Sequence, residues 1–210
     1  TIEGLFGAGD AVGGTPHAFS SGSFTEGRLA AKAACKYIDD GKAEGIVVSD
    51  AQINRRRNEI YKPLEHYKTY RNAIVAGSVN PHYINPKQGL DRLQKLMDEY
   101  CGGVTVNYMT NEKLLNIGLK KLAIMEEDLE NLAAKDVHEL LRAWELKHRH
   151  RAAECVTQHT LFRKETRWPG YYYRGDAMKV DDKNWHVLTV SRRDPKTGEY
   201  TMEKAPCYHL

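Results

Sequence analysis

The spacing of hydrophobic positions changes along the chain and predicts where its helices lie. From residue 87 onward, apolar residues such as Leu90, Leu93 and Met97 recur every three or four positions, which is the period of an amphipathic helix. Similar patterns begin after Asn111 and Asp136, and both residue types cap helix starts well. Three amphipathic helices in succession with short connections predict a helical bundle over residues 87–162.

The first part of the chain has a different pattern. Residues 1–40 are predicted to form a strand, a glycine-rich turn and a helix. The apolar residues before Gly7 supply the strand, and the turn continues through Gly14. The helix is expected to begin near Ser20, a good capping residue, and to end near Asp39.

Two further stretches complete the expected organisation. Residues 41–86 read as a polar connector with helical pieces. Residues 163–210 form a tail that begins rich in arginine and aromatic residues. The tail ends in a predicted hairpin with strands at 185–191 and 199–204, since Asp194–Gly198 has proline early and glycine late, as a tight turn needs.

Composition narrows the class of protein. The 210 residues are 41% hydrophobic, the net charge is only +3 and the mean hydropathy is −0.62, which is ordinary globular composition. The apolar runs are too short to cross a bilayer, and the charge gives no reason to expect nucleic acid. The chain starts at Thr1 inside an expected strand, without a signal peptide, so we expect a fragment of a longer protein.

The cysteines and histidines do not predict a metal site. The four cysteines lie more than fifty residues apart, at Cys35, Cys101, Cys155 and Cys207. This spacing excludes a zinc ribbon and iron–sulfur ligation by a motif within the chain, and it suits reduced thiols in the cytoplasm. On the third predicted helix, His148, His150 and His159 lack the four-residue spacing of helical zinc ligands.

The turn after the first predicted strand carries the candidate chemistry. Asp10 can accept hydrogen bonds from sugar hydroxyls, and Gly13 and Gly14 let the backbone approach a ligand closely. The serine-rich helix start at 20–23 would offer free N–H groups and a dipole that favour negative charge. The alternative is an ordinary strand–turn–helix connection without a ligand.

The same segment resembles a known family. The run from Thr1 to Asp10, with Gly13-Gly14 and the serine-rich stretch that ends at Arg28, resembles the second FAD-binding segment of the fumarate reductase and succinate dehydrogenase flavoprotein superfamily. The resemblance implies that Asp10 binds the ribityl chain of FAD. It also implies that the flavin pyrimidine is bound by the helix start, which comprises Ser20, Ser21, Gly22 and Ser23.

The resemblance also implies a fold. Residues 1–40 would be the C-terminal edge of a Rossmann-like FAD-binding domain, with its last strand, turn and helix. The whole chain would then be an α+β fragment, in which this edge is followed by a mainly α-helical bundle domain and a C-terminal β-hairpin tail.

Within the superfamily, three runs of the tail resemble the alpha subunits of dissimilatory adenylylsulfate reductases. The runs are Trp168–Arg174, Asp181–His186 and Asp194–Gly198. The resemblance implies reduction of adenosine 5′-phosphosulfate to sulfite and AMP, or the reverse, through a flavin N5–sulfite adduct. It also implies a partner, an iron–sulfur beta subunit with two [4Fe–4S] clusters. His17 is a candidate catalytic residue with an equally plausible structural role in the turn.

Several interpretations remain open at this point. The chain could belong to a flavoprotein of the fumarate reductase or succinate dehydrogenase type, or it could be a non-catalytic helical interaction module. Arg163, Arg167 and Arg174 could form internal salt bridges or line a cleft between domains. The nucleotide-binding glycine fingerprint of the family is absent from this sequence, so the chain alone is expected to bind FAD poorly and to catalyse nothing.

Overall fold

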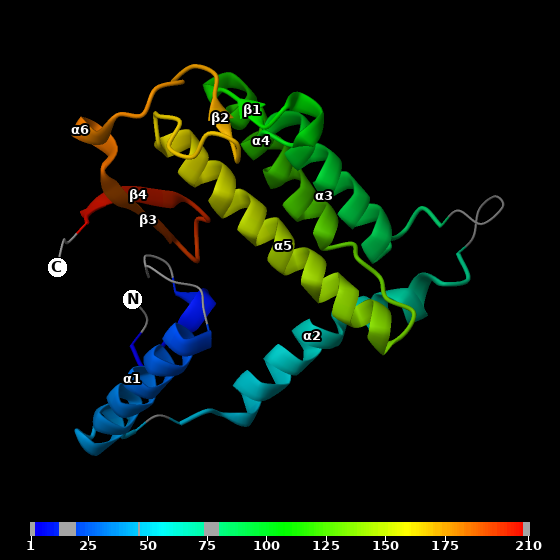
Figure 1. Cartoon of the computed structure of the whole chain (residues 1–210). Coiled ribbons are helices and arrows are strands. Elements are labelled where there is room, and N and C mark those ends of the chain that lie inside the picture. Colours follow the sequence, from blue (N-terminus) through cyan, green and yellow to red (C-terminus); the bar gives the residue numbers. More distant parts are fainter. Residues whose placement is uncertain (1–2, 13–19, 46, 74–79, 208–210) are drawn as a thin grey trace. The chain divides into compact units, whose positions relative to one another are not determined.

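The computed structural model describes residues 3–12, 20–45, 47–73 and 80–207. The chain forms two compact units, Thr1–Arg55 and Arg56–Leu210, and each is described by itself. Figure 1 labels the elements, most of which are helices, so the predicted mainly helical α+β class with a C-terminal hairpin is confirmed. Among the described residues, no helix combines the length and the apolar character needed to span a membrane.

The first unit contains a short 3-10 helix, η1 (Gly9–Ala11), and a long helix, α1 (Ser20–Asp39). α1 ends at the predicted residue, before Gly41, whose φ of +72° suits a glycine after a helix. The strand expected before the turn is not formed: residues 3–8 are a turn followed by irregular chain. A strand needs a neighbouring strand to pair its backbone groups, and none pairs with these residues in the described part of the chain.

The helix α2 (Asp50–Tyr70) begins in the first unit and continues into the second. Ser49 and Gln52 start it with a reciprocal cap. Gln52 Oε1 accepts a hydrogen bond from the Ser49 N–H at 2.8 Å, and Ser49 Oγ accepts one from the Gln52 N–H at 3.3 Å. Pro63 lies inside this helix. The stretch predicted to hold helical pieces therefore contains one long helix.

The second unit is built on three helices, α3 (Pro86–Tyr100), α4 (Glu112–Leu129) and α5 (Val137–Phe162). Asn111 and Asp136 cap α4 and α5 as predicted, because each side chain accepts a hydrogen bond from the backbone N–H three residues later. Asn85 caps α3 in the same way, and the Gln88 side chain returns a hydrogen bond to its backbone.

The core lies where the helices of the bundle face one another. Its buried side chains are Leu93, Leu96, Leu122, Met125, Leu129, Leu132, Ala143, Leu146 and Ala153. α3 lies against α5 at Gly89, where an added Cβ would lie 2.4 Å from Leu146 Cδ2. The missing side chain of Gly89 therefore lets these two helices touch.

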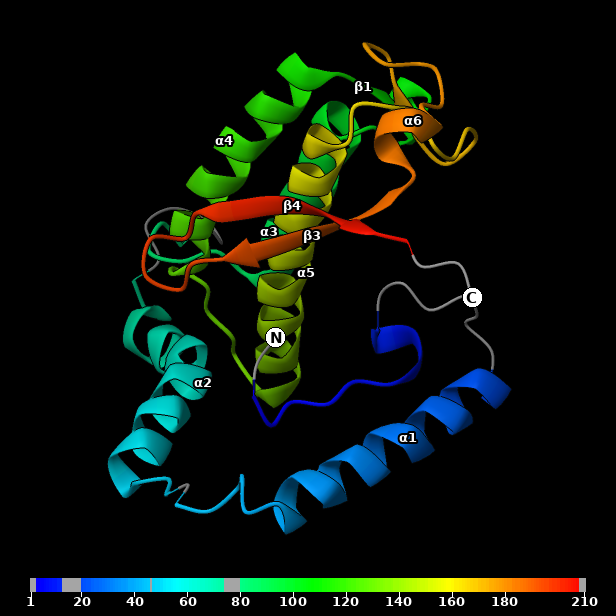
Figure 2. The same ribbon diagram turned by 90° about the vertical axis from the view of Figure 1, so that its left-hand side faces the viewer.

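Two pairs of short strands complete the second unit. Between α3 and α4 lie η2 (Val104–Val106) and β1 (Met109–Thr110), and the tail contributes β2 (Tyr173–Arg174), α6 (Asp182–Trp185), β3 (Val187–Arg193) and β4 (Tyr200–Pro206). β1 and β2 are parallel, and β3 and β4 form the predicted antiparallel hairpin. Figure 2 shows the hairpin crossing α5. β3 begins two residues later than predicted because Trp185 ends α6.

Candidate functional site

The predicted binding turn is centred on Gly9 and Asp10 in the first unit. Gly9 is buried and has a φ of +68°, in the left-handed region that favours glycine. Its carbonyl accepts a hydrogen bond from the Val12 N–H at 2.9 Å, which closes the turn. Asp10 is exposed, so its carboxylate is accessible to a ligand.

Two contacts attach this turn to α1. A Cβ added at Gly9 would lie 2.9 Å from Ser23 Oγ, so the backbone of the turn approaches the helix at a distance that only glycine allows. The Gly9 N–H also donates a hydrogen bond to Glu26 Oε2 at 2.6 Å. Ser23 and Glu26 are three residues apart and share one face of α1. Together the contacts place Asp10 beside the first turns of the helix.

A hollow of about 640 Å³ lies between the turn and α1. Its lining residues are Asp10, Ser20, Ser23, Phe24, Gly27, Arg28 and Ala31. The structure thus brings three of the predicted site residues, Asp10, Ser20 and Ser23, to one surface.

The other predicted residues are placed differently. Gly22 is buried in α1, and Ser21 is exposed, with its backbone carbonyl accepting a hydrogen bond from Thr25 Oγ1 at 3.0 Å. Neither of them lines the hollow. Three predicted residues lie outside the described part of the chain: Gly13, Gly14 and His17.

The lining of the hollow determines what it can bind. The Asp10 carboxylate can accept hydrogen bonds from ligand hydroxyls, and the hydroxyls of Ser20 and Ser23 can donate or accept. The N–H groups and dipole at the start of α1 favour negative charge, and Arg28 adds a cation. The arrangement therefore suits a ligand with hydroxyl groups near Asp10 and a negatively charged edge near the start of α1.

Two residues of this site, Glu26 and Arg28, were not predicted. Helical spacing from the serines is the signal that could have found them. Glu26 follows Ser23 by three residues, and Arg28 follows Ser20 by eight, so each lies on the same side of the helix as a predicted residue.

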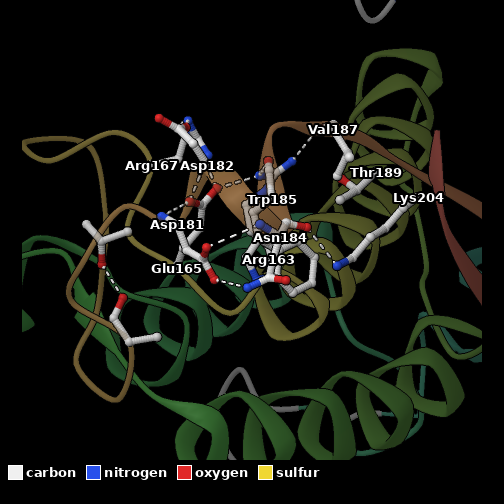
Figure 3. Close-up of polar contacts among 12 residues, drawn as sticks. Arg163, Glu165, Arg167, Asp181, Asp182, Asn184, Trp185, Val187, Thr189 and Lys204 are labelled. Atoms are coloured by element: carbon white, nitrogen blue, oxygen red, sulfur yellow. Dashed lines mark hydrogen bonds and ion pairs between the residues drawn. The ribbon is translucent and has the colours of Figure 1, made fainter. Parts of the chain in front are cut away.

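A separate cluster of charges surrounds Glu165 in the second unit (Figure 3). The Glu165 side chain is 0% exposed, and its carboxylate pairs with Arg163 at 2.6 Å and with Arg167 at 2.8 Å. The Asp181 N–H donates to its second oxygen at 2.8 Å. Burial would raise the pKa of Glu165, but these hydrogen bonds outweigh burial and hold the pKa below its usual value. The carboxylate is therefore ionised between two guanidinium groups.

Both of these arginines use their other donors inside the protein as well. Arg163 donates to the backbone carbonyls of Trp185 at 2.8 Å and Val187 at 2.7 Å, which ties it to the start of β3. Arg167 also pairs with Asp182 at 2.5 Å. Since each guanidinium group is engaged with internal acceptors, the structure supports the interpretation of internal salt bridges.

Arg174 is 1% exposed and closes the C-terminal end of α5. Its guanidinium donates to the backbone carbonyls of Thr160, Leu161 and Arg163 at 2.5, 3.1 and 2.8 Å, and it pairs with Asp176. The hydrogen bond from Arg174 is the main cause that lowers the pKa of Asp176 to about 2. Arg174 therefore stabilises the fold rather than a ligand.

Two histidines of α5 also make internal contacts. The side chain of His159, on α5, contacts β3, with its ring nitrogens 2.8 Å from Thr189 Oγ1 and 2.9 Å from Ser191 Oγ, and burial lowers its pKa. His150 is buried, with Nε2 2.8 Å from the Leu122 carbonyl oxygen. Within the described residues, no group of three or more His, Cys, Asp or Glu side chains is arranged to hold a metal ion.

Comparison with known proteins gives consistent matches. The family model described as "Fumarate reductase flavoprotein C-term" matches residues 90–209. The adenylylsulfate reductase subunit alpha of Megalodesulfovibrio gigas is 40% identical over 211 residues, covering 100% of this chain and 31% of that protein. The solved structure of adenylylsulfate reductase from Archaeoglobus fulgidus is 50% identical, has a TM-score of 0.90, and is matched over 96% of this chain and 31% of that chain. A structure of adenosine-5-phosphosulfate reductase in complex with sulfite, as a covalent adduct, gives the same four values of 50%, 0.90, 96% and 31%.

The matches cover nearly the whole of this chain but only part of each relative. The chain spans about a third, 31%, of the length of these relatives. The family model covers more than half of the chain, residues 90–209, which includes most of the bundle and the tail hairpin. The chain therefore belongs to the fumarate reductase flavoprotein C-terminal family.

Proposed function

We propose that the whole protein containing this chain is a flavoprotein oxidoreductase. It reduces adenosine 5′-phosphosulfate to sulfite and AMP, or runs the reverse reaction, with FAD as cofactor. The observation that carries this proposal is the 50% identity with the Archaeoglobus fulgidus adenylylsulfate reductase, which extends over 96% of the chain at a TM-score of 0.90. A relative of the same similarity holds sulfite as a covalent adduct, which supports sulfite as a product.

The hollow beside α1 fits this cofactor. The backbone at Gly9 comes as close to α1 as a missing side chain permits, which leaves the Asp10 carboxylate facing the surface shared with Ser20 and Ser23. Asp10 would hold hydroxyls of the ribityl chain, and Ser20 and Ser23 would face the pyrimidine. The proposed set also includes four residues of the same segments that do not contribute to the described lining: Gly13, Gly14, Ser21 and Gly22.

The chain's contribution to the reaction is electrostatic. When bound and reduced, FAD would supply the two electrons that convert the sulfur of the substrate to sulfite. The first turn of α1 stabilises negative charge at the pyrimidine edge of a bound flavin through its N–H groups and dipole. Arg28 adds positive charge on the same face of the helix. His17 is the candidate residue of this chain for contact with the substrate.

The proposed division of the chain follows from this site. Residues 1–40 are the edge of an FAD-binding domain, 41–86 a connector, 87–162 the helical bundle, and 163–210 the tail with its hairpin. Support for further protein packed on α1 comes from the apolar side chains of this helix that remain exposed, which are Phe24 (77%), Leu29 (62%) and Ile38 (62%).

The source of electrons is proposed to be a separate iron–sulfur beta subunit with two [4Fe–4S] clusters. The four cysteines of this chain are widely separated and free, so they do not form a cluster motif within it. Free thiols also suit the cytoplasm, where we place the protein.

Addition of sulfite to the flavin-loaded whole protein tests this function. We expect loss of the visible flavin absorption band, and formation of adenosine 5′-phosphosulfate from AMP and sulfite when an electron acceptor is supplied. The second candidate for the function is a fumarate reductase, because the matching family model describes the C-terminal part of that flavoprotein. An unchanged spectrum together with turnover of fumarate would contradict the proposal and favour that candidate. A whole protein that binds no flavin would instead indicate a non-catalytic helical module.

A further inference from the structure

We infer that Glu26 is a positioning residue that sets the place of Asp10 relative to the first turns of α1. The inference rests on the proposed function, in which the ligand of this hollow is FAD. Glu26 is not among the residues that line the hollow, so it acts on the ligand through the turn that carries Asp10.

The contact between Glu26 and the turn is short and links distant parts of the chain. Glu26 Oε2 accepts the hydrogen bond of the Gly9 N–H at 2.6 Å, across seventeen residues. A hydrogen bond from an N–H to a carboxylate is charge-assisted and therefore stronger than one between neutral groups. Gly9 is buried, so loss of this acceptor would leave its N–H without compensation.

The turn is held from two directions. Ser23 limits how closely the turn can approach the helix, because a Cβ at Gly9 would lie only 2.9 Å from Ser23 Oγ. Glu26 prevents the turn from moving away, because its carboxylate holds the Gly9 N–H. The hydrogen bond from the Val12 N–H to the Gly9 carbonyl at 2.9 Å closes the turn over Asp10. Asp10 therefore moves with Gly9, and the place of Gly9 depends on Glu26.

Replacing Glu26 separates its possible roles. E26Q keeps an oxygen that can accept the Gly9 N–H, whereas E26A removes the acceptor. E26D keeps the charge but shortens the side chain by one methylene, so it loses the reach of the contact. A residue that acts by its charge would tolerate E26D, and a residue that positions the turn by a hydrogen bond would tolerate E26Q.

The matched control is E44A in the same unit. Glu44 is exposed, and its side chain makes no hydrogen bond or ion pair among the residues that the structure describes. All variants are made in the whole protein that contains this chain. Three quantities are measured on each: the hydrogen-exchange rate of the Gly9 amide without flavin, the dissociation constant for FAD by fluorescence titration, and the thermal midpoint.

We expect E26A and E26D to accelerate exchange at Gly9 and to weaken FAD binding about tenfold, as expected for loss of a hydrogen bond to a charged group. E26Q should stay within about threefold of the unsubstituted protein, and E44A should leave all three quantities unchanged. If E26A fails to fold, the comparison of E26D with E26Q shows whether Glu26 positions the turn by its hydrogen bond, because only E26Q keeps an acceptor within reach of the Gly9 N–H.

Two results would overturn the inference and point to different causes. If the unsubstituted protein binds FAD and E26A binds it equally well, Glu26 does not position Asp10, whatever the change in its thermal midpoint. If the unsubstituted protein binds no FAD, the proposed function itself is wrong and the inference falls with it.

Discussion

Buried charges in the second unit are stable because each has its partners in place. The Glu165 carboxylate has no exposed surface and pairs with both Arg163 and Arg167. The Arg174 guanidinium pairs with Asp176 and donates a hydrogen bond to a backbone carbonyl at the end of α5. In such clusters the loss of one member costs more than the pair contributes, because the remaining charges stay partly buried without compensation.

Replacement of Glu165 by alanine tests this cluster. It leaves two guanidinium groups, of Arg163 at 16% exposure and of Arg167 at 20%, without their shared carboxylate. We expect the free energy of unfolding to fall by about 3 kcal/mol, measured by urea denaturation. The control is E59A, which breaks an exposed pair with Arg56 and should cost less than about 1 kcal/mol. Equal effects of the two changes would contradict the role of burial.

Asp176 makes the stability depend on pH in the acid range. Its pKa in the folded protein, about 2, lies below the ordinary value of 3.8, so its stabilising effect is complete above that ordinary value and is lost as the pH falls toward 2. The contribution is about 1–2 kcal/mol after allowance for its partly exposed side chain. D176N should therefore be less stable at pH 7 and show a shallower loss of unfolding free energy between pH 4 and 2. If the unfolding free energies of D176N and of the unsubstituted protein fell in parallel between pH 4 and 2, the role of Asp176 would be contradicted.

At the residue scale, the sequence predicted which side chains could bind a ligand better than it predicted which residues contact one another. Asp10, Ser20 and Ser23 were predicted and do share one surface. Glu26 was missed, because its contact with Gly9 joins positions seventeen residues apart and depends on how the turn folds back on α1. Helical spacing could have placed Glu26 on the same face of α1 as Ser23, but it carries no signal for the contact with Gly9.

At the scale of elements, helices were predicted most accurately because their period and caps are local. The starts of α4 and α5 follow from Asn111 and Asp136, and the turn of the hairpin follows from glycine near its end. The expected strand before Gly7 was wrong, since strand formation depends on a pairing partner and not on apolar residues alone. α6 was missed because it is a single short turn.

Contact between α3 and α5 depends on the absence of a side chain at Gly89. G89A should force the helices apart, because the new Cβ would overlap Leu146 at 2.4 Å. We expect a loss of about 1–3 kcal/mol in unfolding free energy by urea denaturation, despite the better helix propensity of alanine. Q94A, on the exposed side of the same helix, is the matched control and should be neutral or slightly stabilising. A gain in stability from G89A would show that the helices can separate at little cost.

At the scale of the whole chain, the two units differ in how much they bury. Among the described residues of the first unit, only Gly9 and Gly22 are buried, whereas the second unit has a continuous core from three helices. The sequence indicated where the bundle lies, but it did not reveal this difference in burial, because apolar residues such as Phe24 and Leu29 occur in α1 as well.

This difference predicts uneven protection in the 210-residue chain. Amide hydrogens in the middle of α4 and α5 should exchange only on global unfolding, because these helices supply most of the buried side chains of the core. Amide hydrogens of α1 should exchange at least a hundredfold faster, since its side chains bury little surface. Hydrogen exchange read by mass spectrometry or NMR measures both, and equal protection of α1 and α5 would contradict the prediction.

The cap that Arg174 forms at the end of α5 affects when the bundle can finish folding during synthesis. The last carbonyls of α5, at Thr160 and Leu161, obtain their partner from a residue more than ten positions further along the chain. During synthesis, therefore, the helix leaves the ribosome with an unfinished end, and the bundle cannot reach its final stability until the segment through Arg174 has followed. A ribosome that pauses within that segment would hold a bundle with unpaired carbonyls, and a nascent chain stopped there would be an early target for proteolysis.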